Sequence, residues 1–192
     1  MKALYDRIMK EGRSIGGGII KMDRFLNHQI DPQLMMQAAR EMVNRFADNK
    51  NINKILTIEA SGIAPAILVG YLMKLPVVFA KKAKPSTMGD FYAANVHSFT
   101  KDRDTTIVIA KDYLSEKDHV LFLDDVLAFG NAGLGMLDLC RQSGTTIEGM
   151  GFLVEKAFEN GRQALEAEGV SRIESLAIID SLDNNEIRIK AL

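Results

Sequence analysis

Two adjacent carboxylates, Asp124 and Asp125, follow the apolar run 120–123 and precede a glycine-bearing turn. Side-by-side acids at the end of a buried strand repel each other and lose hydration. The simplest interpretation is a solvated pair at the carboxyl edge of a sheet. A ligand site is the alternative, because ligands of open α/β sheets bind outside the carboxyl ends of the strands.

The residues after the acidic pair, AFGNA (128–132), lead into an apolar helix expected over 130–142. A helix N-terminus offers unpaired N–H groups and the positive end of a dipole, which together suit a phosphate. The nearby carboxylates would repel that phosphate unless a polyhydroxylated or cationic group lies between. A ribose phosphate meets this demand, although it is not the only ligand that would.

Other nucleotide and metal motifs fit this stretch poorly. GNAGLG (130–135) spaces its glycines as GxxGxG, not as the GxGxxG of dinucleotide-binding turns. No GK[ST] follows it, which excludes a P-loop, and the loop lacks the oxygen ligands and terminal Glu of an EF-hand. His28, His97 and His119 are too dispersed to suggest a zinc site.

The elements that must position these residues alternate between helix and strand patterns, which predicts an α/β fold with a largely parallel sheet. No repeat or linker divides the chain, so we expect a single domain over 1–192. Residues 81–92 have the composition of a mobile loop. Helices are expected at 1–12, 32–48, 62–73, 130–142 and 157–168, and strands at 52–58, 76–80, 93–99, 105–110, 120–123, 149–155 and, as a strand or hairpin, within 173–190.

Composition narrows the class of protein. Hydrophobic residues make up 47% and charged residues 26% of the chain, and the net charge is −1 with basic residues scattered, so no nucleic-acid partner is expected. The most apolar segment, 62–73, is too short to span a bilayer, and the N-terminus lacks an apolar signal core. The single cysteine, Cys140, excludes an internal disulfide and fits a buried structural thiol. These features together predict a cytoplasmic protein.

Several stretches, in this order, resemble a known family. Four apolar positions, two acids, two apolar positions and Ala-x-Gly are similar to the phosphoribosyl pyrophosphate (PRPP) motif of type I phosphoribosyltransferases. Within that family, the whole chain resembles the bacterial xanthine phosphoribosyltransferases. The stretches that carry this second resemblance are FLNHQID (25–31), IEASGIAPA (58–66), VVFAKK (77–82), HSFTK (97–101) and LVEKAF (153–158).

The resemblance implies a twisted, mostly parallel sheet flanked by helices. It also implies a hood subdomain from residues 1–30 and 156–192 and a flexible loop at 82–96 that closes to exclude water. The implied enzyme is a pentosyltransferase that moves the 5-phosphoribosyl group from PRPP to xanthine, giving xanthosine 5′-monophosphate and pyrophosphate in purine salvage. The family acts as a homodimer and uses Mg²⁺ that arrives with PRPP, without a dedicated protein metal site.

The resemblance also assigns roles to residues. Asp124 and Asp125 would face the ribose and stabilise the positive charge that develops on an oxocarbenium-like sugar. Lys81, beside Lys82, would help neutralise the leaving pyrophosphate. The pyrophosphate loop would be Ala60, Ser61 and Gly62, and the PRPP phosphate turn would be Ala128, Phe129, Gly130, Asn131 and Ala132.

Base recognition is implied for three residues. Lys156 would point its ammonium at the 6-oxo group of xanthine, and Asn27 would donate an N–H to the 2-oxo group. Ile20 would pack against the ring. Without the resemblance, Asn27 would be interpreted as a turn or capping amide and Lys156 as a surface lysine.

Two departures from the family pattern change these expectations. Phe129 stands where most type I enzymes have Thr, and Asn131 where the xanthine branch has Gln, so backbone amides and the Asn131 side chain are expected to hold the phosphate. Ala128 stands where hypoxanthine–guanine enzymes have an aspartate near N7. No general base is then supplied by this motif, and we expect xanthine to react as its anion.

Two rival functions remain open at this point. The first is a transferase that prefers guanine, hypoxanthine or adenine. The second is a regulator that senses PRPP without catalysis. Such regulators usually carry a DNA-binding module, whereas only some thirty residues precede the helix expected at 32–48, and they include no basic recognition helix.

Overall fold

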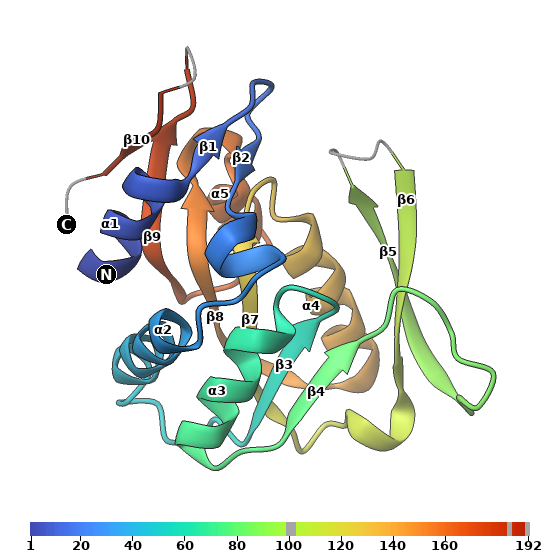
Figure 1. Cartoon of the computed structure of the whole chain (residues 1–192). Coiled ribbons are helices and arrows are strands. Elements are labelled where there is room, and N and C mark those ends of the chain that lie inside the picture. Colours follow the sequence, from blue (N-terminus) through green and yellow to red (C-terminus); the bar gives the residue numbers. More distant parts are fainter. Residues whose placement is uncertain (99–102, 184–185, 191–192) are drawn as a thin grey trace.

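The computed structural model of the chain describes residues 1–98, 103–183 and 186–190. A six-stranded sheet in the order β10-β9-β8-β7-β3-β4 forms its centre (Figure 1), and only the pairing of β10 with β9 is antiparallel. This architecture confirms the predicted α/β fold. The strands are β3 (Lys54–Ile58), β4 (Val77–Ala80), β7 (His119–Leu127), β8 (Thr146–Lys156), β9 (Ile173–Ser181) and β10 (Arg188–Ile189).

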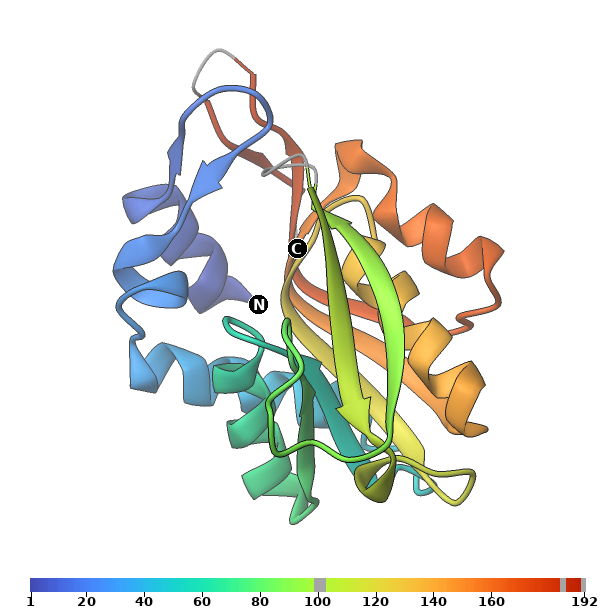
Figure 2. The same cartoon turned by 90° about the vertical axis from the view of Figure 1, so that its right-hand side faces the viewer.

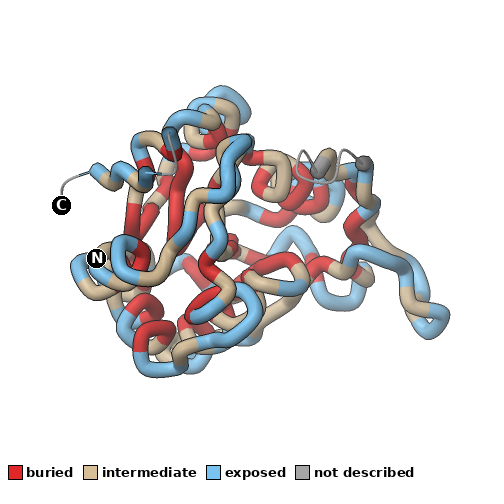
Figure 3. Tube along the Cα trace, turned by 45° about the horizontal axis from the view of Figure 1, so that its top comes forward, coloured by how far each residue is buried: buried red, intermediate tan, exposed pale blue. Residues whose placement is uncertain are grey.

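Helices cover both faces of this sheet, which explains why its strands are nearly continuous apolar runs. Along β7, Leu121 and Leu123 pack into the core formed with α1 (Lys2–Glu11), α2 (Pro32–Arg45) and α3 (Ile63–Met73). Phe122, between them, packs into the other core, against α4 (Asn131–Ser143) and α5 (Gly161–Ala167). Figure 3 shows the central strands as mostly buried chain.

The N-terminal region is built from small elements. After α1, the two-residue strands β1 (Arg13–Ser14) and β2 (Ile20–Lys21) pair antiparallel, and a turn of π-helix (Asp23–Asn27) precedes α2. The turn between β1 and β2 contains Gly16, Gly17 and Gly18, which all adopt positive φ. Asp31 caps α2 as expected, because its Oδ1 accepts from the backbone N–H groups of Gln33 and Leu34 at 3.1 and 3.0 Å.

Strands β5 (Phe91–Ser98) and β6 (Arg103–Ala110) form a separate antiparallel ribbon that lies beside the sheet (Figures 1 and 2). The ribbon packs on α4 so closely that a Cβ on Gly135 would lie 2.4 Å from the Val96 Cγ2. Residues 91–96 of the segment expected to be a flexible loop therefore lie in β5. Of the HSFTK stretch, residues 99–101 lie outside the described part of the chain, as do residues 184–185 and 191–192 of the expected hood.

Strand β7 differs from expectation in one way that matters for the site. The apolar pattern predicted a strand over 120–123 that ends before the acids, whereas β7 continues to Leu127 and pairs Asp124 with Phe152 of β8. The acidic pair thus lies inside a strand, where pairing with β3 ends at Phe122 and pairing with β8 continues past Asp124 to Leu127. Among the described residues, no helix is long and apolar enough to cross a membrane.

Candidate active site

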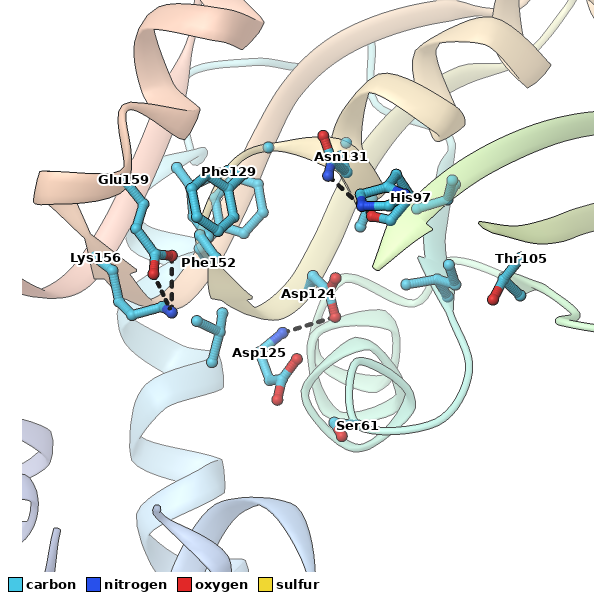
Figure 4. A pocket seen from close by; sticks show the side chains of 18 of the residues that line it. Ser61, His97, Thr105, Asp124, Asp125, Phe129, Asn131, Phe152, Lys156 and Glu159 are labelled. Atoms are coloured by element: carbon cyan, nitrogen blue, oxygen red, sulfur yellow. Dashed lines mark hydrogen bonds and ion pairs between the residues drawn. The ribbon is translucent and has the colours of Figure 1, made fainter. Parts of the chain in front are cut away.

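A cavity of about 470 Å³ lies at the carboxyl ends of β3, β7 and β8 (Figure 4). Most of the residues predicted for the site line this cavity, although they come from distant parts of the sequence. Gly62, Lys81, Ile20 and Asn27 are not among the lining residues. The predicted residues that do line it are Ala60, Ser61, Asp124, Asp125, Ala128, Phe129, Gly130, Asn131, Ala132 and Lys156.

The acidic pair forms the floor of the cavity. Asp124 is 7% exposed, and its Oδ1 accepts from the backbone N–H of Asp125 at 2.9 Å. Burial, and then the charge of Asp125, raise the pKa of Asp124 well above its ordinary value. Burial also raises the pKa of Asp125. Such a pair favours a ligand that brings positive charge or hydroxyl donors.

The turn between β3 and α3 lies directly against Asp124. A Cβ on Gly62 would lie 2.7 Å from the Asp124 Oδ1 and 2.4 Å from the Thr57 Oγ1, so only glycine fits at this position. The peptide bond between Glu59 and Ala60 is cis. Ala60 and Ser61 line the same cavity as the acids, and Gly62 packs against Asp124.

The turn between β7 and α4 presents a helix N-terminus to the cavity. Gly130 adopts a φ of 87°, and the first intrahelical bond runs from the Leu134 N–H to the Gly130 carbonyl at 2.9 Å. The amides of residues 131–133 precede that bond, and no side chain caps the helix. This turn can therefore offer backbone donors to an anion such as a phosphate.

The Asn131 side chain takes a different position from the one expected. Its Nδ2 donates to the His97 backbone carbonyl at 2.9 Å, as Figure 4 shows, so it ties the start of α4 to β5. Phe129 is 38% exposed and lies at the cavity wall. In this structure the phosphate-binding capacity of the turn thus rests on its backbone.

The two lysines after β4 have different surroundings. The Lys81 Nζ lies over the Phe79 ring, 4.9 Å from its centroid, and away from the cavity lining. Lys82 lines the cavity, and its backbone N–H donates to the Glu59 Oε1. The positive charge of Lys82 acts to lower the pKa values of both Asp124 and Asp125, against the larger effect of burial.

The base side of the cavity is less complete. Lys156 ends β8, and its Nζ contacts the Glu159 Oε1 and Oε2 at 2.8 and 2.7 Å and donates to the Gly18 carbonyl at 3.1 Å. Ile20 packs against the hydrophobic core, and the neighbouring Ile19 lines the cavity in its place. Asn27 is exposed on the π-helical turn.

Sequence reasoning missed Glu159, whose side chain is only 8% exposed and which lines the cavity next to Lys156. The available signal was its spacing of three residues from Lys156. It also missed the lining role of Lys82, because nothing in a pair of adjacent lysines indicates which one faces the ligand.

Solved structures with the same fold define the class of protein. The chain matches adenine phosphoribosyltransferase from Rhodothermus marinus with a TM-score of 0.75 and 20% identity, over 93% of this chain and 100% of that one. It matches the Giardia lamblia enzyme, solved with 9-deazaadenine, with a TM-score of 0.68 and 25% identity, over 77% and 80% of the two chains. The fold is therefore that of the type I phosphoribosyltransferases, as predicted.

Relatives with similar sequences show to which branch of the type I phosphoribosyltransferases the chain belongs. Xanthine phosphoribosyltransferase from Bacillus cereus (strain AH187) is 46% identical over 188 residues, which cover 97% of this chain and 94% of that protein. The corresponding protein of Bacillus mycoides (strain KBAB4) is 47% identical over the same shares. No family model matches the chain. The chain belongs to the xanthine phosphoribosyltransferase family, which confirms the resemblance read from its motifs.

Proposed function

We propose that this protein transfers the 5-phosphoribosyl group of PRPP to xanthine, giving xanthosine 5′-monophosphate and pyrophosphate. One observation carries the proposal within the structure. The acidic pair, the open N-terminus of α4, the turn residues Ala60 and Ser61, and Lys156 all border one cavity of about 470 Å³. Near-full-length identity to proteins named xanthine phosphoribosyltransferase supports the choice of base.

Different parts of the cavity would bind different parts of the two substrates. The backbone amides at the start of α4 would hold the 5′-phosphate, and Asp124 and Asp125 would accept from the ribose hydroxyls. The 60–62 turn and Lys82 would face the pyrophosphate. Xanthine would first lose a proton to solvent. The C1′–oxygen bond to pyrophosphate then breaks, and a bond forms from C1′ to a ring nitrogen of the xanthine anion. The acids stabilise the positive charge that the sugar carries in between.

Magnesium fits this arrangement as a companion of PRPP. In the described part of the chain, no group of three or more His, Cys, Asp or Glu side chains could hold a metal alone. Mg²⁺ is commonly bound by one or two carboxylates together with substrate phosphates. Asp124 and Asp125 would supply those carboxylates, and the ion would neutralise phosphate charge.

Recognition of the base requires a change from the structure described above. Lys156 already borders the cavity and would donate to the 6-oxo group of xanthine. Asn27 would have to approach from its exposed position to donate to the 2-oxo group. Ile19, which lines the cavity, and Ile20, the first residue of β2, would move with it. We place this reaction in purine salvage in the cytoplasm, performed by a homodimer.

One assay tests the proposed function against its rivals. Purified protein with PRPP and Mg²⁺ is offered xanthine, guanine, hypoxanthine or adenine, and pyrophosphate release is followed. Turnover that favours xanthine supports the proposal, and a preference for another purine replaces the assigned substrate. PRPP binding without turnover of any purine would indicate a sensor. Removal of Mg²⁺ with a chelator should abolish turnover, and sedimentation measurements test the homodimer.

A further inference from the structure

Lys156 and Glu159 form a buried ion pair in the wall of the cavity, and the mechanism above uses only the lysine. Their side chains are 9% and 8% exposed, and both carboxylate oxygens lie within 2.8 Å of the Lys156 Nζ. Figure 4 shows the two side chains pointing toward each other beside the cavity. The ammonium also donates to the Gly18 carbonyl, so it is anchored from two elements.

The pair gives the cavity wall a neutral pattern of one donor beside one acceptor. A lone buried lysine would cost several kcal/mol, and a carboxylate partner offsets much of that cost. The ammonium has three N–H donors, of which its hydrogen bonds to the Glu159 Oε1 and the Gly18 carbonyl use two. The buried Glu159 Oε2 lies 2.7 Å from the ammonium but makes no hydrogen bond among the described residues. Each group therefore keeps capacity for one contact with a ligand.

This pattern is complementary to a ring that carries a carbonyl oxygen next to an N–H. A 6-oxopurine has this arrangement, because its 6-oxo group lies beside a ring N–H. A 6-aminopurine has the opposite arrangement, with an amino donor at position 6 and a bare ring nitrogen beside it. It would set a donor against Lys156 and an acceptor against Glu159, and a buried polar site rejects such a ligand.

The backbone around the pair is held in place before any ligand binds. Arg162 contacts both oxygens of the buried Glu155, at 2.9 and 2.6 Å, and donates to the Ile173 carbonyl at 2.9 Å. Gly161 fits against the phosphate turn so closely that a Cβ there would lie 2.1 Å from the Ala128 carbonyl oxygen. Residues 156–160 thus lie between two fixed points, which preorganises the Lys156–Glu159 pair.

We propose that Glu159 is a specificity-determining residue that, together with Lys156, recognises the carbonyl and neighbouring N–H of a 6-oxopurine and disfavours a 6-aminopurine. The inference rests on the proposed function, because it assigns the purine to this side of the cavity.

Steady-state kinetics of Glu159→Gln and Glu159→Ala test the role. We expect the KM for xanthine to rise about tenfold or more, the usual effect of losing one hydrogen bond to a charged group. The preference for xanthine over adenine should fall by a similar factor, while the KM for PRPP stays unchanged. Glu116→Gln is the matched control, since Glu116 is exposed and outside the cavity lining. It makes the same change of charge and should leave all three values unchanged.

Methylated bases test direct contact with the base. Xanthine methylated at N1 or at N7 should bind wild-type protein weakly, and Glu159→Ala should restore binding of the one whose methyl group replaces the N–H read by Glu159. If neither variant alters the KM for xanthine or the preference over adenine, and neither methylated base gains affinity, the proposal is overturned. Loss of PRPP affinity equal to loss of xanthine affinity would also overturn it.

Two further measurements keep the result independent of folding and of turnover. Circular dichroism checks each variant, and Glu159→Gln, which preserves side-chain volume, carries the test if Glu159→Ala is unfolded. Calorimetric binding of xanthosine and adenosine monophosphates needs no catalysis. Wild-type protein that fails to turn over xanthine would refute the proposed function. The ratio of the two nucleotide affinities in wild type and in Glu159→Gln would still support or overturn the role of Glu159.

Discussion

The two halves of the cavity differ in how far their residues are already assembled. The phosphate half (residues 59–62, 124–125 and 128–133) has nearly all of its predicted residues at the cavity lining. The base half (residues 17–20, 27 and 156–159) has only Lys156 of its three predicted residues there. In the proposed function, the residues that would bind the phosphates therefore lie on the central sheet and the turns that follow its strands, whereas Ile20 and Asn27, which would contact the base, lie on the short β2 strand and the π-helical turn.

The supporting elements explain this contrast. Asp124 lies in β7, which pairs in parallel with β3 on one side and β8 on the other. Ile20 lies in β2, a two-residue strand that pairs only with the equally short β1. An isolated two-stranded hairpin is marginally stable at best, whereas a central strand is held by two neighbours and by packing on both faces. The base half can therefore move at a lower cost than the phosphate half.

The largest effect is expected from removing one carboxylate of the acidic pair in the phosphate half. Asp124→Asn should lower kcat by about 10²–10³-fold, because it removes one charge that stabilises the transition state in a dry site. Circular dichroism should show an unchanged fold. The distant Asp112→Asn, an exposed position, serves as the control. An Asp124→Asn protein with near wild-type kcat would remove the acid from catalysis.

The same Asp124→Asn variant should be more stable than wild type at neutral pH. Burial raises the pKa of Asp124, so ionisation is harder in the folded chain than in the unfolded one. Wild-type stability is therefore lost as pH rises from the ordinary aspartate pKa of about 3.9 through the raised folded value. We expect the free energy of unfolding of the variant to exceed that of wild type at neutral pH, because the variant has no carboxylate to ionise in the buried position. Denaturant titrations at several pH values should show this gain vanish near pH 4.

The contact that joins the two halves should give the next largest effect. A Cβ on Gly161 would lie 2.1 Å from the Ala128 carbonyl oxygen and 2.7 Å from the Gly130 N. Gly161→Ala should therefore push the phosphate turn and the 156–160 segment apart. We expect the KM values for both PRPP and xanthine to rise, and stability to fall by about 1–3 kcal/mol, as for other overpacked sites. Gly169→Ala is a weaker comparison, since no atom lies within 4 Å of its added Cβ, although its φ of 92° adds strain.

Asn27→Ala tests the part of the base half that lies away from the cavity lining. Because Asn27 is exposed, its removal should leave the melting temperature unchanged. The preference for xanthine over guanine should fall about tenfold, the effect of one lost hydrogen bond in a closed site, with little change in PRPP affinity. Equal losses for both purines would exclude Asn27 from reading the 2-oxo group.

The smallest effect is expected from Asn131→Ala. This variant loses the bond from the Asn131 side chain to the His97 carbonyl, at a cost of about 1 kcal/mol. Gln142→Ala is a matched control, because the Gln142 Nε2 donates to the Ala93 carbonyl of the same strand at 2.8 Å but lies outside the cavity lining. Both variants should increase hydrogen exchange in β5. Only Asn131→Ala should also raise the KM for PRPP, and equal KM values for the two variants would contradict this role.

Particular residues show how much could be predicted from sequence. The apolar run before Asp124, the glycine turn after it and the alternation of helices and strands were sufficient for the fold and for the phosphate half. These signals are local in the sequence. The parallel sheet nevertheless brings the residues together in space, because the carboxyl ends of its strands meet at one edge. The expected strand nevertheless stopped too early, since acids normally end a strand and only pairing with β8 extends it to Leu127.

The base half could not be predicted to the same degree. The side chains of Ile19 and Ile20 have the same chemistry, and which of them faces the cavity depends on the register of a two-residue strand. The partner of Lys156 depends on how the 157–159 turn folds back, which no periodicity indicates. The β5–β6 ribbon lies beside the sheet rather than within it, and this position likewise depends on tertiary packing that the local sequence does not indicate.

The close fit of Gly161 against the phosphate turn sets a rule for engineering this enzyme. A designer who wants another purine accepted can vary Ile19, which lines the cavity, and position 159, which borders it beside Lys156. The glycine two positions later is not available for exchange. Libraries that randomise 157–159 while leaving Asn160, which has a φ of 57°, Gly161 and Gly130 untouched should therefore yield many folded proteins, whereas those that also randomise Gly161 should yield few.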